Sequence, residues 1–285
     1  MTDKGIAVIG STTIDKIIFR DCSRLKAGGV TLYSGTTYSR HGFHTIAITN
    51  IATHDAHLIE RLENQGIFVY SGTTPQTTHF INDLRSKDRR QKNPTRAVTI
   101  SRSQIWEHIN DVKFVHLGPL HPDDIDVRAI HSLRALDLTV ILDIQGLVRM
   151  VRNGNVYPAV APQLSDALRV AQIVKANKHE YATLLAFFQS DLMTVMRKFD
   201  IREFIVTAGA SGGFVQDTTA AAIPYDAVTV KSEGDPTGAG DIFLAAYGVA
   251  HLLKQYSIPQ ASRYAALLVA RQIEGKYIKP DDLYI

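Results

Sequence analysis

Cysteine is nearly absent from this chain of 285 residues. The single thiol, Cys22, excludes an internal disulfide framework and the usual cysteine-rich zinc sites, and it favours a reducing compartment. Long apolar runs are also missing, since no stretch approaches the roughly 20 apolar residues that span a bilayer. Met1 to Gly5 lead into the strand-like residues 6–9 without the apolar core of a signal peptide. The sequence therefore predicts a cytoplasmic protein that does not enter a membrane.

An excess of charge of one sign is absent as well. The chain carries 31 basic and 28 acidic residues, a formal net charge of +3. This balance argues against nucleic acid or an anionic membrane surface as a partner. With 45% hydrophobic and 21% charged residues the composition is that of an ordinary globular protein. No repeat, low-complexity segment or Pro/Gly/Ser-rich linker divides the chain, so we expect one domain spanning residues 1–285.

Two familiar phosphate-binding motifs are missing, namely the G-x-x-x-x-G-K-[ST] loop and a G-x-G-x-x-G after the first strand. A different glycine-rich run, Gly234-Asp235-Pro236-Thr237-Gly238-Ala239-Gly240-Asp241, precedes apolar residues at helical spacing. A helix that begins at or just before Asp241 would point unpaired N–H groups at an anion. Asp241 could then act as the general base in phosphoryl transfer. The alternatives are a tight strand-to-helix turn and a helix N-cap.

Short apolar runs alternate with helical patterns along the chain. The expected strands are residues 6–9, 45–49, 114–117, 139–143, 173–176 and 204–207, and the expected helices are residues 54–64, 124–135, 179–188, 192–199, 241–255 and 259–273. This order predicts an α/β fold, a mostly parallel sheet covered by helices on both faces. Ligands of such sheets bind at the carboxyl ends of strands, where Gly118, Asp143, Asn177 and Thr207 fall.

Asn177 and Glu180 stand three residues apart at the start of an expected helix. Both side chains then share one helix face, and their oxygen atoms suit Mg²⁺ or its coordinating waters. The same spacing is typical of a capping box, in which the two residues bond the helix N-terminus. The two interpretations are compatible, and both stay open on the sequence alone.

Four motifs in order resemble the ribokinase-like, or PfkB, family of carbohydrate and nucleoside kinases. Asp235 to Asp241 resembles its signature, and Asn177-Lys178-His179-Glu180 resembles its Asn-x-x-Glu motif. The other matches are to its Thr-x-Gly-x-x-Gly nucleotide loop and its N-terminal di-glycine, at Thr207-Ala208-Gly209-Ala210-Ser211-Gly212 and Ala27-Gly28-Gly29. With an early aspartate, Asp15, the resemblance covers essentially the whole chain.

The resemblance implies an ATP- and Mg²⁺-dependent kinase. It gives Asp241 the role of catalytic base, with Gly238, Ala239 and Gly240 as the anion hole, and it assigns Mg²⁺ to Asn177 and Glu180. ATP would lie against Thr207, Gly209 and Gly212, although a plain strand-to-turn connection fits that loop too.

On the acceptor side, the resemblance implies that Asp15, Gly28 and Gly29 line the pocket. The run Asp143-Ile144-Gln145-Gly146-Leu147-Val148-Arg149 resembles the inositol-kinase-like branch, so Asp143, Gln145 and Arg149 are expected at the acceptor. Asp143 could instead be a turn residue at the end of its strand. A small polyol or sugar is the expected substrate, and a nucleoside kinase or a non-catalytic sugar- or nucleotide-binding protein of the same fold are the alternatives.

Residues 71–101 depart from the α/β rhythm. We expect strands at 77–81 and 97–101, joined by a polar loop, and further strands at 12–20 and 29–33. The resemblance implies that these segments, near 12–35 and 71–101, form a small β lid, through which the family's members could also form a homodimer. The basic residues of the loop are most simply a solvated surface. Arg85, Arg89 or Arg90 could alternatively meet an anionic acceptor.

Overall fold

The computed structural model describes residues 5–19, 22–85, 90–219, 221–231 and 234–285. Its larger sheet has the strand order β15-β14-β13-β12-β9-β8-β1-β4-β5. Strands from β13 to β5 in that order pair in parallel, whereas β14 and β15 add an antiparallel edge. The strands are β1 (Gly5–Ile9), β4 (Thr45–Asn50), β5 (Ile67–Gly72), β8 (Val112–Leu117), β9 (Thr139–Asp143), β12 (Ile173–Asn177), β13 (Glu203–Thr207), β14 (Gly213–Gln216) and β15 (Ile223–Tyr225).

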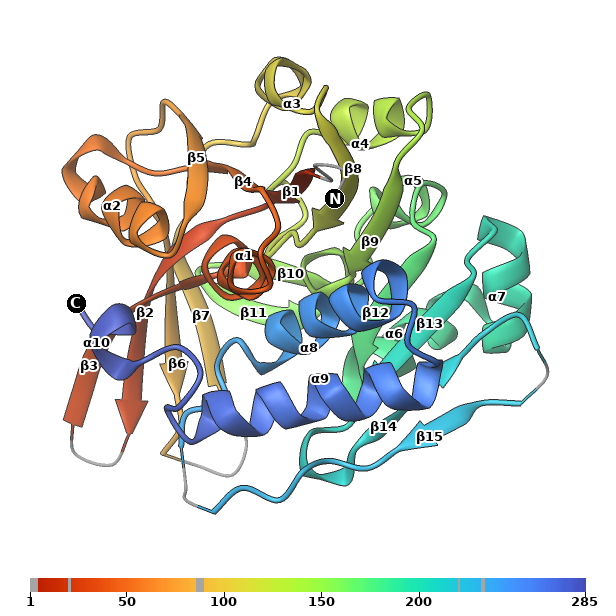
Figure 1. Cartoon of the computed structure of the whole chain (residues 1–285). Coiled ribbons are helices and arrows are strands. Elements are labelled where there is room, and N and C mark those ends of the chain that lie inside the picture. The colour runs from red at the N-terminus through yellow and green to blue at the C-terminus, as the bar shows by residue number, and fades with distance from the viewer. Residues whose placement is uncertain (1–4, 20–21, 86–89, 220, 232–233) are drawn as a thin grey trace.

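Helices cover both faces of this sheet (Figure 1). One face packs against α1 (Val30–Arg40), α2 (His57–Asn64), α8 (Ala239–Gly248) and α9 (Ile258–Ile273). The other packs against α3 (Arg102–His108), α4 (Val127–Leu133), α5 (Leu164–Leu168), α6 (Lys178–Phe188) and α7 (Leu192–Phe199). The short α10 (Pro280–Leu283) follows α9. Because β1 and β4 are buried on both faces, their side chains divide between the two apolar clusters. The expected α/β fold is therefore confirmed.

A second sheet has the strand order β10-β11-β7-β6-β2-β3. Its strands are β2 (Thr12–Phe19), β3 (Cys22–Gly29), β6 (Thr78–Asp83), β7 (Arg90–Thr95), β10 (Arg149–Arg152) and β11 (Asn155–Pro158). The chain enters it directly from the larger sheet, because only Gly10 and Ser11 separate β1 from β2. Figure 1 shows β2, β3, β6 and β7 extending away from the larger sheet, on the side where α8 begins. Strands β10 and β11 were not expected from the sequence.

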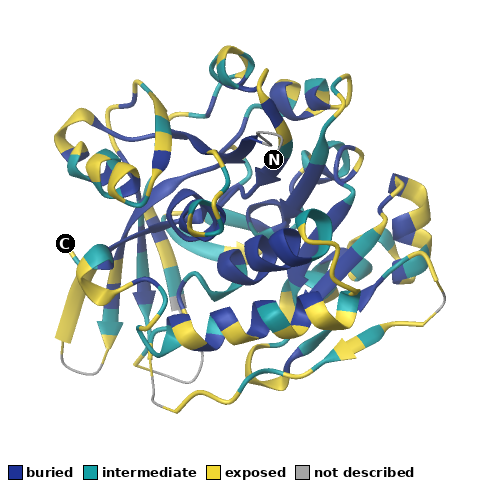
Figure 2. Cartoon of the chain, viewed as in Figure 1, coloured by how far each residue is buried: buried dark blue, intermediate teal, exposed yellow. Residues whose placement is uncertain are grey.

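The expected strand at 29–33 is wrong, because α1 begins at Val30. Gly29 has a φ of 90°, and this conformation turns the chain out of β3 and into the helix. The Thr- and Ser-rich helix is buried because its hydroxyls find partners inside the protein. Thr31 shares a 2.6 Å hydrogen bond with Thr12, and Ser34 donates to the carbonyl of Asp241 over 3.1 Å. Figure 2 shows α1 and α8 as the buried centre of the molecule.

The expected strand at 97–101 is also wrong. The N–H groups of Ala97 and Val98 donate to the side chains of Thr78 and Thr74 instead of a neighbouring strand. Only Ile100 forms an isolated bridge there. The second strand of this region is β7, which forms where charged residues had suggested a loop. Residues 97–101 form no strand because two of their N–H groups bond side chains 19 and 24 residues away, and the local sequence pattern does not reveal these acceptors.

The expected helices all form, with two of them divided. Residues 54–64 split into a 3-10 turn, η1 (Thr53–Asp55), and α2, while the helix from Asp241 changes at its end into a π-helical turn, η4 (Val249–Leu253). Two further 3-10 turns are η2 (Gln145–Val148) and η3 (Gly209–Ser211). No helix in the described ranges is both long and apolar enough to cross a membrane.

Candidate active site

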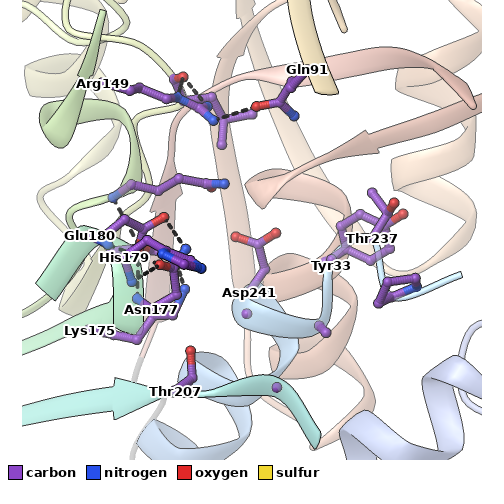
Figure 3. A pocket seen from close by; sticks show the side chains of 18 of the residues that line it. Tyr33, Gln91, Arg149, Lys175, Asn177, His179, Glu180, Thr207, Thr237 and Asp241 are labelled. Atoms are coloured by element: carbon purple, nitrogen blue, oxygen red, sulfur yellow. Dashed lines mark hydrogen bonds and ion pairs between the residues drawn. The ribbon is translucent and has the colours of Figure 1, made fainter. Parts of the chain in front are cut away.

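The loops after β9, β12 and β13 meet the turn before α8 and one side of the second sheet around a cavity of about 430 Å³. Every residue that the sequence singled out for catalysis or metal binding lines it, including Asp241, Asn177 and Glu180. Figure 3 shows Asp241 in the middle of this cavity, between the Asn177 and Glu180 side chains on one side and Tyr33 on the other. The topology thus brings together segments separated by more than 200 residues.

The glycine-rich turn presents the start of α8 to the cavity. Gly238 is the residue before the helix and has a φ of 83°, a left-handed conformation that glycine adopts without strain. A Cβ on Gly238 would come within 2.5 Å of the Tyr33 ring, so this position also lacks room for a side chain. Ala239 and Gly240 form the first helical turn, whose N–H groups and positive dipole end favour an anion. The geometry fits the anion hole that the sequence predicted.

Asp241 is the third residue of α8 and is only 9% exposed. Burial raises the pKa of its carboxyl to about 7, the nearby Asp143 adds to this rise, and Lys175 opposes it. A carboxylate with a pKa near neutrality is well matched to take a proton from a hydroxyl at physiological pH. It lies in the first turn of the helix rather than at the N-cap, which is Gly238.

Asp143 forms a buried ion pair with Lys175 at the back of the cavity. The Lys175 Nζ lies 2.7 Å from Asp143 Oδ2, and both side chains are at most 5% exposed. The other carboxylate oxygen accepts the N–H of Gln145, which makes Asp143 a turn residue at the end of β9. Burial disfavours the charged ammonium, but Asp143 and Glu180 outweigh burial and raise the pKa of Lys175. Lys175 was not predicted as a site residue, although a lone charge within an apolar strand is a usable signal.

Asn177 and Glu180 form the predicted capping box. Asn177 Oδ1 accepts the N–H groups of His179 and Glu180, and Glu180 Oε2 accepts the N–H of Asn177 over 2.7 Å. Asn177 Nδ2 also donates to Glu180 Oε1 over 2.6 Å. Each Glu180 oxygen keeps a second lone pair, so the pair fits a role on the water shell of Mg²⁺. Within the described ranges, no group of three or more His, Cys, Asp or Glu side chains could enclose a metal.

The loop after β13 separates this cavity from a second one of about 480 Å³ with a mainly apolar lining. Thr207 and Gly209 border both cavities, and Gly212 borders the apolar one. A Cβ on Gly209 would meet nothing within 4 Å, so its side faces open space. A Cβ on Gly212 would instead lie 2.1 Å from the carbonyl of Tyr225, so packing alone requires glycine there. Packing against Tyr225 therefore explains a glycine at position 212 but not at position 209, where a side chain would have room.

The second sheet supplies the opposite wall of the first cavity. Asp15 on β2 is 5% exposed and accepts a hydrogen bond from Thr13 Oγ1 over 2.8 Å. A Cβ on Gly28 would come within 2.9 Å of its carboxylate, so Gly28 lies behind Asp15 and, among the described residues, is not part of the lining. Gly29 does line the cavity. The Thr13 bond thus helps to fix the Asp15 carboxylate at this wall of the cavity.

Arg149 lies at the start of β10, and its guanidinium is held from three directions. Its Nε donates to the carbonyl of Leu120 over 2.6 Å, its Nη1 donates to Gln91 Oε1 over 2.9 Å, and its Cζ lies 5.2 Å from the centre of the Phe80 ring. Gln145, Gln91 and Phe80 also line the cavity. Gln91 and Phe80 were not predicted as site residues. Gln91 lies in a charged segment that suggested a loop, and an apolar residue such as Phe80 in the expected strand 77–81 is more simply a core residue.

The basic loop contributes less than the alternative interpretation required. Arg85 makes an exposed ion pair with Asp83 over 2.7 Å and is not among the described residues that line the cavity. Arg89 and the side chain of Arg90 lie outside the described part of the chain. The described arginine at the cavity is therefore Arg149.

A family model described as pfkB family carbohydrate kinase matches residues 3–276 of the sequence. No curated protein matches. Among solved structures, a pyrophosphate-dependent kinase in the ribokinase family, complexed with a pyrophosphate analog and myo-inositol, is 24% identical, with a TM-score of 0.81 over 94% of this chain and 95% of that one. A Burkholderia thailandensis nucleoside kinase in complex with inosine is 17% identical, with a TM-score of 0.78 over 96% and 93%. Ribokinase from Thermotoga maritima is 18% identical, with a TM-score of 0.72 over 94% and 92%. These likenesses bear on the fold.

Proposed function

This chain belongs to the pfkB family of carbohydrate kinases, and we propose that it transfers the terminal phosphoryl group of ATP to a hydroxyl of a compact polyol, an inositol-like ring. The carrying observation is that Asp241, a carboxyl group with a pKa of about 7, lies in the first turn of a helix whose unpaired N–H groups border the same cavity. Asp241 takes the proton of the attacking hydroxyl, while the turn formed by Gly238 to Gly240 stabilises charge on the transferred group.

The apolar cavity supports a nucleotide donor. It adjoins the phosphate turn through Ala239 and Gly240, and its lining includes Val228, Val269 and Ile273. A nucleotide would bury the faces of its base there, while its phosphates reach Gly240. Pyrophosphate has no base and would leave this cavity unused. A kinase of the same fold nevertheless depends on pyrophosphate. We therefore propose ATP as the donor and treat pyrophosphate as the competitor that an experiment must test.

The acceptor wall supports a polyol rather than a nucleoside. Asp15, Gln91, Gln145 and Arg149 all line the cavity with hydrogen-bonding groups. The Phe80 ring, which could stack on a base, is already faced by the Arg149 guanidinium. A site built from fixed polar groups rejects analogues that lack a matching hydroxyl. A neighbour in the same fold binds myo-inositol and another binds inosine, so the fold itself does not decide between them.

Mg²⁺ would be held through Asn177 and Glu180, and it would supply charge neutralisation on the donor phosphates. The second sheet would act as the lid over the acceptor, since it contributes Asp15, Phe80 and Gln91 to the cavity. Its exposed apolar side chains, among them Phe19 and Leu25, are compatible with a homodimer through this sheet.

The test is a matrix of donors and acceptors with purified protein. ATP or pyrophosphate is combined with myo-inositol, other polyols, sugars, adenosine and cytidine, and the phosphate monoester is followed by phosphorus NMR. We expect the highest kcat/KM with ATP and a polyol, and a kcat lower by about 10²–10⁴-fold with the Asp241→Asn variant. Turnover with pyrophosphate but not ATP would overturn the donor assignment. A nucleoside preferred at least about tenfold over every polyol, a margin of about 1.4 kcal/mol, would overturn the acceptor assignment.

A further inference from the structure

Lys26 is a buried cation on β3 of the second sheet. Its side chain is only 2% exposed, although a lysine normally keeps its ammonium in water. The Nζ atom lies 2.7 Å from Oδ2 of Asp235, which is 209 residues away in the sequence. Because an unpaired buried charge costs several kcal/mol, this ion pair decides where both groups lie.

Asp235 begins the turn that leads to the phosphate site. Its second oxygen, Oδ1, accepts the N–H of Thr237 over 2.9 Å and the Thr237 hydroxyl over 2.6 Å. This bonding fixes the chain immediately before Gly238, the residue that opens α8. Burial opposes ionisation of Asp235, but Lys26 and the Thr237 bonds outweigh burial and keep its pKa below the ordinary value. One carboxylate therefore bonds the second sheet with one oxygen and the phosphate turn with the other.

Two further contacts fix the lysine itself. The Nζ atom lies 5.5 Å from the centre of the Tyr33 ring, the same ring against which Gly238 packs. On the edge of β3 that does not pair with β2, Lys26 forms a bridge with Tyr284, and Ile285 donates its N–H to the carbonyl of Leu25 over 3.1 Å. The backbone of Lys26 is thus held from both sides, so that a shift of β3 moves the ammonium and with it Asp235.

We propose that Lys26 is a positioning residue for phosphoryl transfer, which acts through Asp235 to set the turn carrying the phosphate-binding N–H groups and thereby links the acceptor-side sheet to the donor-side turn. Lys26 and Asp15 are both on this sheet, on paired strands at the same register. The sheet that carries Asp15 therefore also holds the turn, through the Lys26–Asp235 ion pair. This inference rests on the proposed kinase function.

The experiment compares Lys26→Met, Asp235→Asn and the double variant with Lys16→Met. Methionine keeps the length of the lysine stem, and asparagine keeps an acceptor for Thr237 while it removes the charge. Lys16 is the matched control, since it is an exposed lysine on the adjacent strand β2. We measure kcat and acceptor KM, the melting temperature, and hydrogen exchange of the amides in residues 237–241.

We expect Lys26→Met to lower kcat by about 10- to 100-fold, the scale of an ångström-sized misplacement, with acceptor KM changed less than about threefold and faster exchange in residues 237–241 than in wild type. Lys16→Met should match wild type. If the two residues act as one pair, the double variant loses no more than the worse single variant. Should Lys26→Met melt below the assay temperature, Asp235→Asn alone carries the comparison.

Wild-type kcat and exchange in Lys26→Met would overturn the inference, and so would a loss confined to acceptor KM or penalties that multiply in the double variant. Failure of the proposed function looks different. A wild-type protein without turnover on any donor and acceptor would sink that proposal, while the exchange measurement would still decide whether Lys26 positions the turn.

Discussion

The Lys175 ammonium lies 2.7 Å from the Asp143 carboxylate, and a Cβ on Gly240 would come within 2.6 Å of the same ammonium. A positive charge is therefore placed directly behind the phosphate turn, and its counterion is the second largest influence on the pKa of Asp241 after burial. The two members of the pair act on Asp241 in opposite directions, since Asp143 raises that pKa and Lys175 lowers it.

Opposite shifts of the pH profile follow from this arrangement. Because the base must be ionised, activity should rise with pH through about 7 in wild type. Asp143→Asn removes a negative neighbour, so the acid limb of log kcat/KM should move to lower pH. Lys175→Met removes the opposing positive charge, so the limb should move to higher pH. The profile is measured in a constant-ionic-strength buffer series, with Lys113→Met, an exposed lysine on β8, as the control.

If the acid limb of log kcat/KM in both variants coincided with that of wild type, neither Asp143 nor Lys175 would influence the pKa of Asp241. Since removing one partner of a buried pair is destabilising by about 3–5 kcal/mol, the double variant Asp143→Asn/Lys175→Met serves as the stability control.

Replacing Asp241 should separate activity from stability. Asp241→Asn should lower kcat by about 10²–10⁴-fold through loss of the base, with ATP binding retained. The wild-type carboxyl has a folded pKa of about 7, above its unfolded value, so its ionisation weakens the fold as pH rises between the two values. The variant should therefore melt higher than wild type at pH 8 and nearly alike at pH 4. Near-normal turnover, or a variant less stable at pH 8, would contradict this assignment.

The fold was largely predictable because its signals are local. Apolar runs such as β1 and β4 need only neighbouring residues to be recognised, and each expected strand of the larger sheet appears. The second sheet was harder, because β7 forms from a charged segment and 97–101 loses its ladder to the side chains of Thr74 and Thr78. These outcomes depend on contacts between distant segments.

The site divides in the same way. Asp241, Asn177 and Glu180 belong to short motifs, so they could be found in the sequence and they meet in one cavity. Lys26, Tyr33 and Gln91 gain their roles only through partners far along the chain, such as Asp235 for Lys26 and Arg149 for Gln91. No spacing rule connects those pairs. Asp143 shows the converse, because its motif marked it as a site residue and it lines the cavity, while its contact with Lys175 could be known only from the structure.

Glu180→Gln should distinguish a magnesium role from capping. Glutamine at this position can still accept the N–H of Asn177, so the capping box and the fold should persist. The loss of charge should raise the Mg²⁺ concentration needed for half-maximal rate, with acceptor affinity nearly unchanged in the absence of nucleotide. An Mg²⁺ titration of the steady-state rate provides the measurement. A curve that overlays wild type would leave capping as the only function of Glu180.

His251 should make stability depend on pH far from the site. Its Nε2 lies 2.8 Å from Glu203 Oε1, and Nδ1 lies 2.6 Å from the carbonyl of Tyr256. The bond to Glu203 raises the pKa of His251, so its stabilisation is complete below the unfolded pKa of about 6.5 and is lost as pH rises through the folded pKa. Melting of wild type and His251→Gln should differ more at pH 6 than at pH 9. An equal difference at both pH values would refute the linkage.

Acceptor choice gives the sharpest test of the second sheet. Asp15 is buried on β2 with one oxygen bonded to Thr13, and its carboxylate faces the same cavity as Asp241. Asp15→Ala should therefore impair acceptor use far more than ATP binding, because a buried hydroxyl of the substrate would lose its fixed partner. Asp15→Asn, which keeps one acceptor oxygen, should recover part of the loss.

Removing the Asp15 charge also removes one of the groups that raise the pKa of Asp241, so the acid limb of log kcat/KM should shift slightly to lower pH. Steady-state rates with myo-inositol and with deoxy analogues, beside ATP affinity from calorimetry, check each part. If Asp15→Ala weakened ATP binding as much as acceptor use, the carboxylate would have to serve the donor side, and the assignment of this wall to the acceptor would fall.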